Sequence, residues 1–268
     1  MVQVIKFSGE KEEFNPKKIE RTLKRAGATQ EQTNRIIKTV KKRIKDGMTT
    51  KQILNIVYSE LKKHPGVAAR YNLKRAIMSL GPGGFTFEKY FAQLLEAHGY
   101  NTQLNQVIKG KRINQEVDII ARKDKTYMVE CKYYLYPGNY AGTKEAMYTY
   151  ARFLDTNSRK HNFDQPWLAT NTKCSWSALE YAKGVGIKIT SWKNPPKENL
   201  QKLIETKKLY PITILRSVNK FVRERLFYSG ITMVKTLIET DIQTLKRKTR
   251  LKDRELKKII QEAKQICA

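Results

Sequence analysis

The sequence has 268 residues, enough for two or three small domains, and its 40% hydrophobic content excludes a chain that is disordered throughout. Its 53 basic and 25 acidic residues give a net charge of +28, which favours a polyanionic partner such as nucleic acid; a solubilising basic surface is the alternative. The three cysteines are odd in number and lack metal-ligand spacing, so neither a disulfide framework nor a zinc site is indicated.

The sequence also bears on where the protein works. Its first residues show no basic head followed by an apolar stretch, and no apolar run reaches the roughly 18 residues of a membrane span. We therefore expect a cytoplasmic protein with no membrane partner.

The charge is unevenly distributed along the chain. Residues 1–80 carry a net +12 and residues 201–268 a net +10, whereas residues 81–200 hold 11 acidic residues and a net of only +6. An acid-rich middle segment between two basic segments is the pattern expected of a nucleic-acid-binding protein whose middle segment holds a cation-binding catalytic centre.

The first 80 residues begin with two short strand patterns and then become helical. Asn15-Pro16 is typical of a helix N-cap and first helical residue, because proline there loses no hydrogen bond. Apolar spacing predicts further helices, one of them capped by Thr49 or Thr50 and the last spanning 67–80. The glycine-rich stretch 81–84 marks a domain boundary.

The middle segment alternates between helix and strand patterns. Helices are predicted over 87–98, 144–155 and 175–183, and strands over 105–107, 116–121, 127–134, 166–169 and 187–192. This order predicts an α/β domain with a mixed sheet. The run Asn194-Pro195-Pro196 is typical of a linker.

Residues 200–268 are predicted to be all helix. Gly230 is typical of a helix C-cap, and Thr232 and Thr240 or Asp241 are typical of N-caps. A longer helix is predicted from Asp253, and it buries Leu256, Ile259, Ile260, Ala263 and Ile266.

The residues that say most about function lie in a hairpin of the middle segment. Glu116-Val117-Asp118 and Glu130-Cys131-Lys132 flank a turn at 122–126. If the turn is centred on Asp124, Asp118 faces Glu130 and Glu116 faces Lys132, with Cβ atoms about 5 Å apart. An even-numbered loop would shift this pairing by one residue. The other face then carries the core positions Val117, Ile119, Tyr127, Val129 and Cys131.

Three acids and one lysine on a single face suit a divalent cation. Neighbouring carboxylates repel each other unless a cation separates them, and oxygen ligands without histidine or thiolate favour Mg²⁺ over zinc. The lysine can orient or deprotonate a water, or neutralise charge on a phosphate, while the ion polarises that phosphate. The alternative is an exposed face whose charges form surface salt bridges of little energetic value.

The middle segment resembles the Mrr-like restriction endonucleases of the PD-(D/E)xK superfamily. The resemblance rests on Asp118 with Glu130-x-Lys132, on Gly84-x-x-Phe87-Glu88, and on the runs 166–171 and 186–192. It implies a restriction-endonuclease-like α/β core that uses Mg²⁺ or Mn²⁺. Asp118, Glu130 and the Cys131 carbonyl would bind the metal, and Lys132 would act on the water. Glu88 would complete the catalytic set, in which we also include Glu116.

Two departures from the Mrr-like pattern concern the substrate. Val117 stands where the motif's name has proline, and Glu116 stands where many Mrr-like members have glycine. The two acidic runs also resemble archaeal Holliday-junction resolvases. A structure-specific nuclease of repair or recombination therefore stays open beside a restriction nuclease.

The first 80 residues resemble an ATP-cone, the regulatory nucleotide-binding domain of ribonucleotide reductases. The match covers Val4-Ile5-Lys6, Gly9, Glu12-x-Phe14-Asn15, Lys18-Ile19, Thr49-Thr50-x-x-Ile53 and Ala68-x-x-Tyr71. It implies contacts to ATP or a related nucleotide from Lys6, Gly9, Asn15, Lys18, Thr50, Lys74 and Arg75. Phe7-Ser8 replaces the usual basic-acidic pair, and no Walker-type loop is present, so ATP hydrolysis is not implied. The alternative is a basic helical domain that contacts DNA alone.

The last 65 residues resemble helix-hairpin-helix DNA-binding modules, which hold backbone phosphates without reading sequence. The match lies in the apolar frame of 240–245 and 251–263, but Lys248-Thr249-Arg250 lacks the glycines that allow close approach to phosphate. Side-chain charge would then make the DNA contacts. The candidates are Lys246, Arg247, Lys248, Arg250, Lys252 and Arg254. The alternative is a protein-interaction or dimerisation module.

These features predict a multidomain α/β protein: an ATP-cone at 1–82, a nuclease core at 83–195 and an all-helical DNA-binding domain at 200–268. We expect a DNA endonuclease of restriction or defence, with cutting or assembly tuned by a nucleotide. Cutting both strands needs two active sites, which a homodimer would provide. The alternatives are the repair nuclease and a non-catalytic, nucleotide-responsive DNA-binding regulator. The regulator is disfavoured because a binder gains nothing from aligned acids that repel phosphate.

Overall fold

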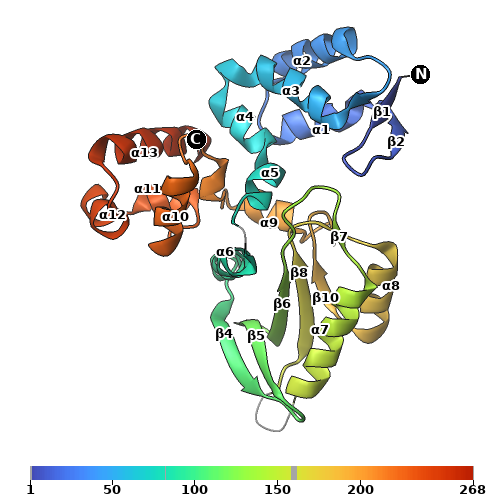
Figure 1. Ribbon diagram of the computed structural model, residues 1–268, viewed down its shortest axis with the longest axis vertical. Helices are drawn as coiled ribbons and strands as arrows, with labels where there is room; N and C mark the ends of the chain where they lie inside the picture. Colours follow the sequence, from blue (N-terminus) through green and yellow to red (C-terminus); the bar gives the residue numbers. More distant parts are fainter. Residues whose placement is uncertain (1, 82, 158–161, 268) are drawn as a thin grey trace. The chain divides into compact units, whose positions relative to one another are not determined.

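The computed structural model describes residues 2–81, 83–157 and 162–267, which fold into two compact units (Figure 1). The first comprises Met1–Ala76, Ile212–Arg225 and Leu237–Ala268, and the second, the nuclease unit, comprises Ile77–Pro211 and Leu226–Thr236. Pro82, in the predicted boundary at 81–84, lies outside the described residues. No helix in the described ranges is long and apolar enough to cross a bilayer.

The N-terminal part of the first unit combines a small sheet with helices. Strand β1 (Gln3–Ile5) lies between antiparallel β2 (Lys11–Glu13) and parallel β3 (Met48–Thr49). The helical elements are α1 (Pro16–Arg25), α2 (Gln30–Arg43), α3 (Thr50–Glu60), η1 (Leu61–Lys63), α4 (Pro65–Tyr71) and α5 (Leu73–Met78). Their apolar faces form one core around Leu23, Ile36 and Val57.

The helix caps of this region follow from the sequence. Asn15 caps α1 by accepting a hydrogen bond from Lys17 N, and Thr49 caps α3 in a capping box with Gln52, so both predictions are confirmed. The single helix predicted over 67–80 is wrong, because the chain breaks it at Asn72 into α4 and α5.

The C-terminal elements are η2 (Ile212–Ile214), α10 (Lys220–Tyr228), α11 (Val234–Glu239), α12 (Ile242–Thr249) and α13 (Asp253–Cys267). Gly230 follows α10 with a φ of +80°, and Asp241 caps α12, both as predicted. Helix α11 begins at Val234, two residues after Thr232, and the Thr232 hydroxyl donates to the Gln93 side chain. Helix α13 buries Leu256, Ile259, Ala263 and Ile266, whereas Ile260 is only half-buried.

Helix α13 packs against α4, so the two chain ends share the first unit. Arg70 links them, because its Nη1 donates to Ile266 O and its Nε donates to Ala26 O, each over 2.8 Å. At Gly66 an added Cβ would lie 2.7 Å from Gln265 O, so the two helices meet too closely for a larger residue.

The nuclease unit is built on a five-stranded mixed sheet of order β10-β8-β6-β5-β4. The strands are β4 (Asn101–Lys109), β5 (Asn114–Arg122), β6 (Thr126–Lys132), β8 (Gln165–Thr170) and β10 (Lys188–Thr190). The first three are antiparallel neighbours, while β6, β8 and β10 run parallel. This arrangement confirms the predicted mixed sheet.

Helices cover both faces of the sheet. Helix α6 (Gly84–Ala97) packs on one face, where Phe91 meets Trp167 edge to face. Helix α7 (Thr143–Thr156) packs on the other with α8 (Trp176–Val185), so even-numbered residues of β6 face α7. Two short strands, β7 (Tyr140–Ala141) and β9 (Lys173–Cys174), pair beyond the main sheet.

The nuclease unit extends past the linker predicted at 194–196. Helix α9 (Leu200–Thr206) belongs to it, since Leu200 N donates to Ser191 O and a His98 ring nitrogen contacts Leu203 O at 2.9 Å. An all-helical domain that starts at 200 therefore does not coincide with a compact unit of the structure.

Candidate functional site

The hairpin of β5 and β6 has the register that the sequence predicts. Ile119 pairs with Val129 and Arg122 with Thr126, so the turn is centred on Asp124. The ladder ends at Ile119, however, and Glu116 pairs with Val107 of β4 instead of facing Lys132. Asp118 and the end of β6 therefore lie beyond the last paired residues of this hairpin.

Asp118 lies where both of its neighbouring ladders are interrupted. The β4–β5 ladder omits the pair of Asp118 with Asn105, whose φ of +49° is unusual for a residue other than glycine. Val117 packs with Ile120 and Met128, not on the opposite face with Ile119, so the alternation predicted here is wrong at Val117. The Asp118 carboxylate bridges to β6: its Oδ2 accepts from Cys131 N over 2.7 Å.

Glu130 is buried between two cations. Its Oε1 lies 2.7 Å from Lys132 Nζ, and its Oε2 lies 2.5 Å from Arg152 Nη1 of α7. Arg152 was not predicted as a site residue. The sequence could have indicated it, because Arg152 lies on the same helix face as the buried residues Ala146, Thr149 and Thr156. A buried charge without a partner is costly, so an arginine on that face predicts a buried acidic partner.

Glu88 and Glu116 reach the same place from α6 and β5. Asn105 joins them, since its Nδ2 lies 3.1 Å from Glu88 Oε2 and 3.4 Å from Glu116 Oε1. Glu88 and Glu116 thus share one partner, and Glu88 is near enough to Glu130 and Lys132 for their charges to affect its pKa. Asn105 was missed, because a contact made through a left-handed backbone position has no periodic signal in the sequence.

The site holds more negative charge than its cations balance. Burial, and then the charge of Glu130, raises the pKa of Asp118 to about 7, although the hydrogen bond from Cys131 N acts against this. Burial also raises the pKa of Glu88; the Asn105 hydrogen bond opposes it, and the charges of Glu116 and Glu130 add to it. These pKa shifts are those expected where a divalent cation is needed to hold the acids ionised.

Lys132 stays protonated in this setting. Burial alone would lower its pKa, but the hydrogen bond to Glu130 and the nearby carboxylates outweigh burial and raise it. Lys132 is therefore suited to stabilise negative charge rather than to accept a proton from water. Its ammonium also lies 5.0 Å from the centre of the Tyr148 ring.

The donor atoms fit a hard divalent cation. Asp118 keeps Oδ1 for a ligand, and the Cys131 thiol stays protonated because burial raises its pKa, so only its carbonyl oxygen can bind. Across residues 2–81, 83–157 and 162–267, no three His, Cys, Asp or Glu side chains are close enough to hold a metal by themselves. Two carboxylates and a main-chain carbonyl are the predicted donors, and Glu130 must give up part of its contact with Lys132 or Arg152 to serve.

The raised pKa of Asp118 predicts a pH-dependent stability. An acid with a raised folded-state pKa keeps its proton in the folded protein after the unfolded chain has lost it, so stability falls as pH rises from about 4 to about 7. Asp118→Asn removes this loss. In urea unfolding without divalent cations, we expect its stability advantage to grow by up to about 2 kcal/mol between pH 5 and pH 8. A constant difference, or one that excess Mg²⁺ leaves unchanged, would contradict this reading of the site.

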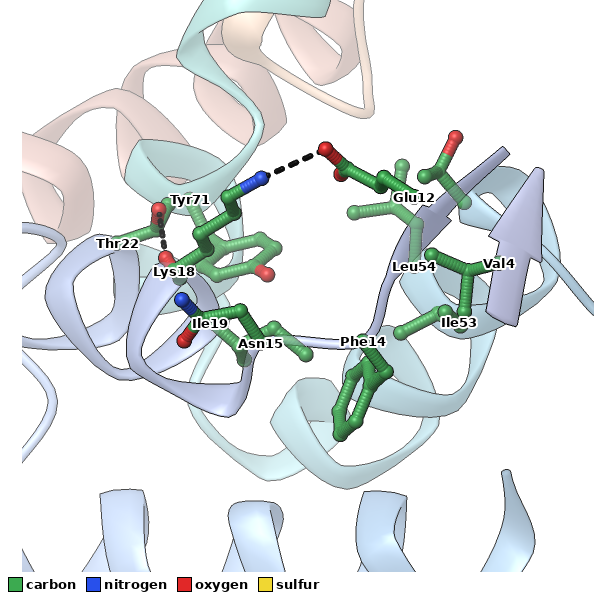
Figure 2. A pocket seen from close by; sticks show the side chains of 11 residues that line it. Val4, Glu12, Phe14, Asn15, Lys18, Ile19, Thr22, Ile53, Leu54 and Tyr71 are labelled. Carbon is green, nitrogen blue, oxygen red and sulfur yellow. Dashed lines mark hydrogen bonds and ion pairs between the residues drawn. The ribbon is translucent and has the colours of Figure 1, made fainter. Parts of the chain in front are cut away.

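A pocket of about 230 Å³ lies in the N-terminal part of the first unit (Figure 2). Its walls are mainly apolar, and its polar residues include three of the predicted nucleotide contacts, Asn15, Lys18 and Thr50. Glu12, which the analysis missed as a site residue, also lines it. Its Oε2 accepts from Lys18 Nζ over 2.9 Å.

The other predicted nucleotide contacts lie outside the lining of this pocket. Lys6 lies 3.2 Å from the same Glu12 oxygen, so it reaches the pocket only through that acid. Gly9, Lys74 and Arg75 do not line it. The apolar walls were not among the predicted nucleotide contacts, although all of their residues except Leu54 belong to the ATP-cone match. They come from Val4, Phe14, Ile19, Ile53, Leu54 and Tyr71.

The candidate DNA contacts gather around the turn between α12 and α13. All six predicted side chains, Lys246, Arg247, Lys248, Arg250, Lys252 and Arg254, are exposed. Arg250 takes a φ of +54°, the left-handed position that glycine usually fills after a helix. Lys246 pairs with Asp253 at 3.0 Å across the turn.

Comparisons with known proteins divide the chain in the same way. The ATP cone domain model matches residues 2–78, and the restriction endonuclease model matches 82–195. The model described as AF1548-like, C-terminal matches 210–267. An uncharacterized protein of Archaeoglobus fulgidus is 45% identical over 176 residues, which cover 65% of this chain and 98% of that protein. The chain belongs to the AF1548-like family.

The crystal structure of AF1548, a protein of unknown function, shares this fold. It is 42% identical, with a TM-score of 0.62, over 69% of this chain and 98% of its own. The middle domain of this family member is thus a restriction-endonuclease-like nuclease domain, accompanied by an ATP-cone.

Proposed function

We propose that this chain is a magnesium-dependent DNA endonuclease regulated by a nucleotide bound in its ATP-cone. The observation that carries the proposal is the placement of Asp118 beside the end of β6. Its Oδ2 accepts from Cys131 N, and the two neighbours of Cys131, Glu130 and Lys132, form an ion pair at 2.7 Å. A surface salt-bridge face would leave Glu130 exposed and Asp118 with an ordinary pKa. Instead, Glu130 is buried and the pKa of Asp118 is raised.

Each residue has a separate task in this proposal. Asp118, Glu130 and the Cys131 carbonyl hold Mg²⁺ or Mn²⁺, which polarises the scissile phosphate and acidifies a bound water. Lys132, as a cation, neutralises charge that develops on the phosphate. Glu88 and Glu116, held by Asn105, add negative charge around the cation.

The proposal predicts that the protein nicks covalently closed circular DNA, a substrate without ends. Purified full-length protein should convert the closed circle to nicked or linear forms when Mg²⁺ or Mn²⁺ is present, and leave it intact in EDTA. Cutting both strands at one place would need a second copy of the site, so linear product should increase with protein concentration if the chain dimerises. Single-stranded and duplex closed circles that both stay intact with every divalent cation, with and without ATP, would rule the proposal out.

Nucleotide binding in the ATP-cone should depend on Lys18. Its ammonium lines the pocket and would exchange Glu12 for a phosphate, so Lys18→Ala should weaken ATP binding by roughly 10- to 100-fold in calorimetric titration. Lys17→Ala is the matched control, because Lys17 is an exposed neighbour on the same helix outside the pocket lining. If ATP affinity falls equally in the two variants, it depends only on the net charge of the unit and not on the pocket.

The exposed cations around the α12–α13 turn are proposed to hold DNA phosphates. Replacing both Arg247 and Arg254 with alanine should flatten the plot of log Kd against log salt by about 0.9 for each lost phosphate contact. Lys62 and Lys63, exposed on η1, provide the paired control. An unchanged slope in the arginine double variant would argue against a DNA-binding role for this turn.

A further inference from the structure

The chain beyond the ends of β6 and β8 forms a connected rim next to the candidate active site. These strands are parallel neighbours in which Lys132 pairs with Thr170, so both leave the sheet at the same edge. From there, residues 133–142 lead into α7 and residues 171–176 lead into α8. Both segments therefore begin within one residue of the catalytic lysine or of its ladder partner.

Hydrogen bonds fix these two segments to each other. The Asn171 side chain accepts from Tyr134 N over 2.9 Å and donates to Tyr134 O over 2.8 Å. Farther along, β7 pairs with β9, and Ser175 N donates to Ala141 O over 2.9 Å. These hydrogen bonds order the rim, so its side chains have fixed positions.

Large aromatic side chains are exposed on the rim and on α7, the helix that follows its first segment. Trp176 is 76% exposed, Tyr136 67%, Tyr140 60% and Tyr148 49%; we call these four residues the aromatic rim. Tyr148 ties them to the active site, since its ring centre lies 5.0 Å from Lys132 Nζ and 5.3 Å from Arg152 Cζ. Exposed aromatic rings on connected segments beside a cluster of charged residues are typical of a binding surface, because such rings add little to the core.

The charge around these rings suits a nucleic acid. Lys173 is the exposed ladder partner of Tyr140, and Lys144 is exposed in the first turn of α7. Rings interleaved with lysines are the combination that binds single-stranded nucleic acid, in which bases stack on the rings and cations meet the backbone. Paired bases within a duplex present only their edges, so intact duplex DNA gives such rings little to stack on.

We propose that the aromatic rim stacks on unpaired bases, so that the DNA cleaved at the adjacent site contains a single-stranded segment. This inference rests on the nuclease function proposed above and names its substrate class. Branched, flapped and single-stranded DNA meet the requirement, and a fully paired duplex does not.

The test is a binding measurement in EDTA, where no cleavage is needed. Fluorescence anisotropy compares a labelled single strand, a fork and a duplex of the same sequence. Tyr140→Ala and Trp176→Ala should each weaken single-strand and fork binding by roughly 5- to 100-fold and leave duplex binding unchanged. Tyr228→Ala, which removes a 92% exposed tyrosine outside the rim, should change nothing.

Tryptophan fluorescence gives a second readout from the unmodified protein. Trp167 and Trp192 are buried, so Trp176 is the tryptophan that a base can reach. A single strand should quench the emission of wild type, and Trp176→Phe should lose this quenching while keeping affinity, because phenylalanine still stacks.

Two results would overturn the inference. If the alanine variants bind a single strand with wild-type affinity, the rim does not take part in DNA binding. A wild type that sediments as a dimer while both alanine variants are monomeric would make the rim an interface between two copies. Selective binding to unpaired DNA by a wild type that never cuts would instead support the rim and refute only the nuclease proposal.

Discussion

Lys132→Ala is expected to reduce kcat for DNA cleavage by about 10²- to 10⁴-fold and to leave KM nearly unchanged. Lys132 Nζ lies 2.7 Å from the buried Glu130 carboxylate, and its raised pKa keeps it charged at neutral pH. A fixed positive charge beside the scissile phosphate stabilises the transition state more than the bound substrate, so the loss falls on kcat.

The control for this variant is Lys125→Ala, which removes an exposed lysine from the turn of the same hairpin. It should cleave DNA at the wild-type rate. If Lys132→Ala also cleaves at that rate in single-turnover experiments with saturating Mg²⁺, the catalytic role of Lys132 is excluded.

Arg152→Ala is expected to lower the free energy of unfolding of the nuclease unit by about 3 kcal/mol. It leaves Glu130 buried with Lys132 as its remaining cationic partner, and it opens a space beneath α7. Urea unfolding followed by tryptophan fluorescence reports on this unit alone, because all three tryptophans of the chain lie in it.

Two further variants separate charge from packing in this experiment. Arg122→Ala, at an exposed arginine of β5, should cost far less. The double variant Glu130→Gln with Arg152→Met removes both charges and should recover most of the stability, since well-packed neutral groups replace a buried ion pair at little cost. A loss for Arg152→Ala no larger than that for Arg122→Ala would show that the pair contributes nothing.

Local patterns were enough to predict much of the nuclease unit. The turn at 122–126 sets the register, and this register places Asp118 beside Cys131, the residue between Glu130 and Lys132. Arg152, Asn105 and Tyr148 were not predicted, because they reach the site from elements whose packing depends on the whole fold. The break in both ladders at Asp118 was also invisible, since a strand pattern carries no sign of an omitted pair.

The first unit shows the same limit at longer range. The spacing around Asn15 and Lys18 identified part of the pocket, but its apolar walls come from several elements brought together by the core. The N-terminal and C-terminal segments pack together through contacts such as the hydrogen bond from Arg70 to Ile266 O, which joins residues 196 positions apart. No local pattern in either segment indicates such a partner.

The proposed nuclease activity requires that Asp118 and Glu130 together hold a divalent cation. It is tested most directly by titrating Mn²⁺ into metal-free protein and following the free ion by electron paramagnetic resonance. We expect one saturable site in wild type, and loss of that site in both Asp118→Asn and Glu130→Gln. Mn²⁺ binding of equal affinity and stoichiometry in wild type and both variants would contradict it.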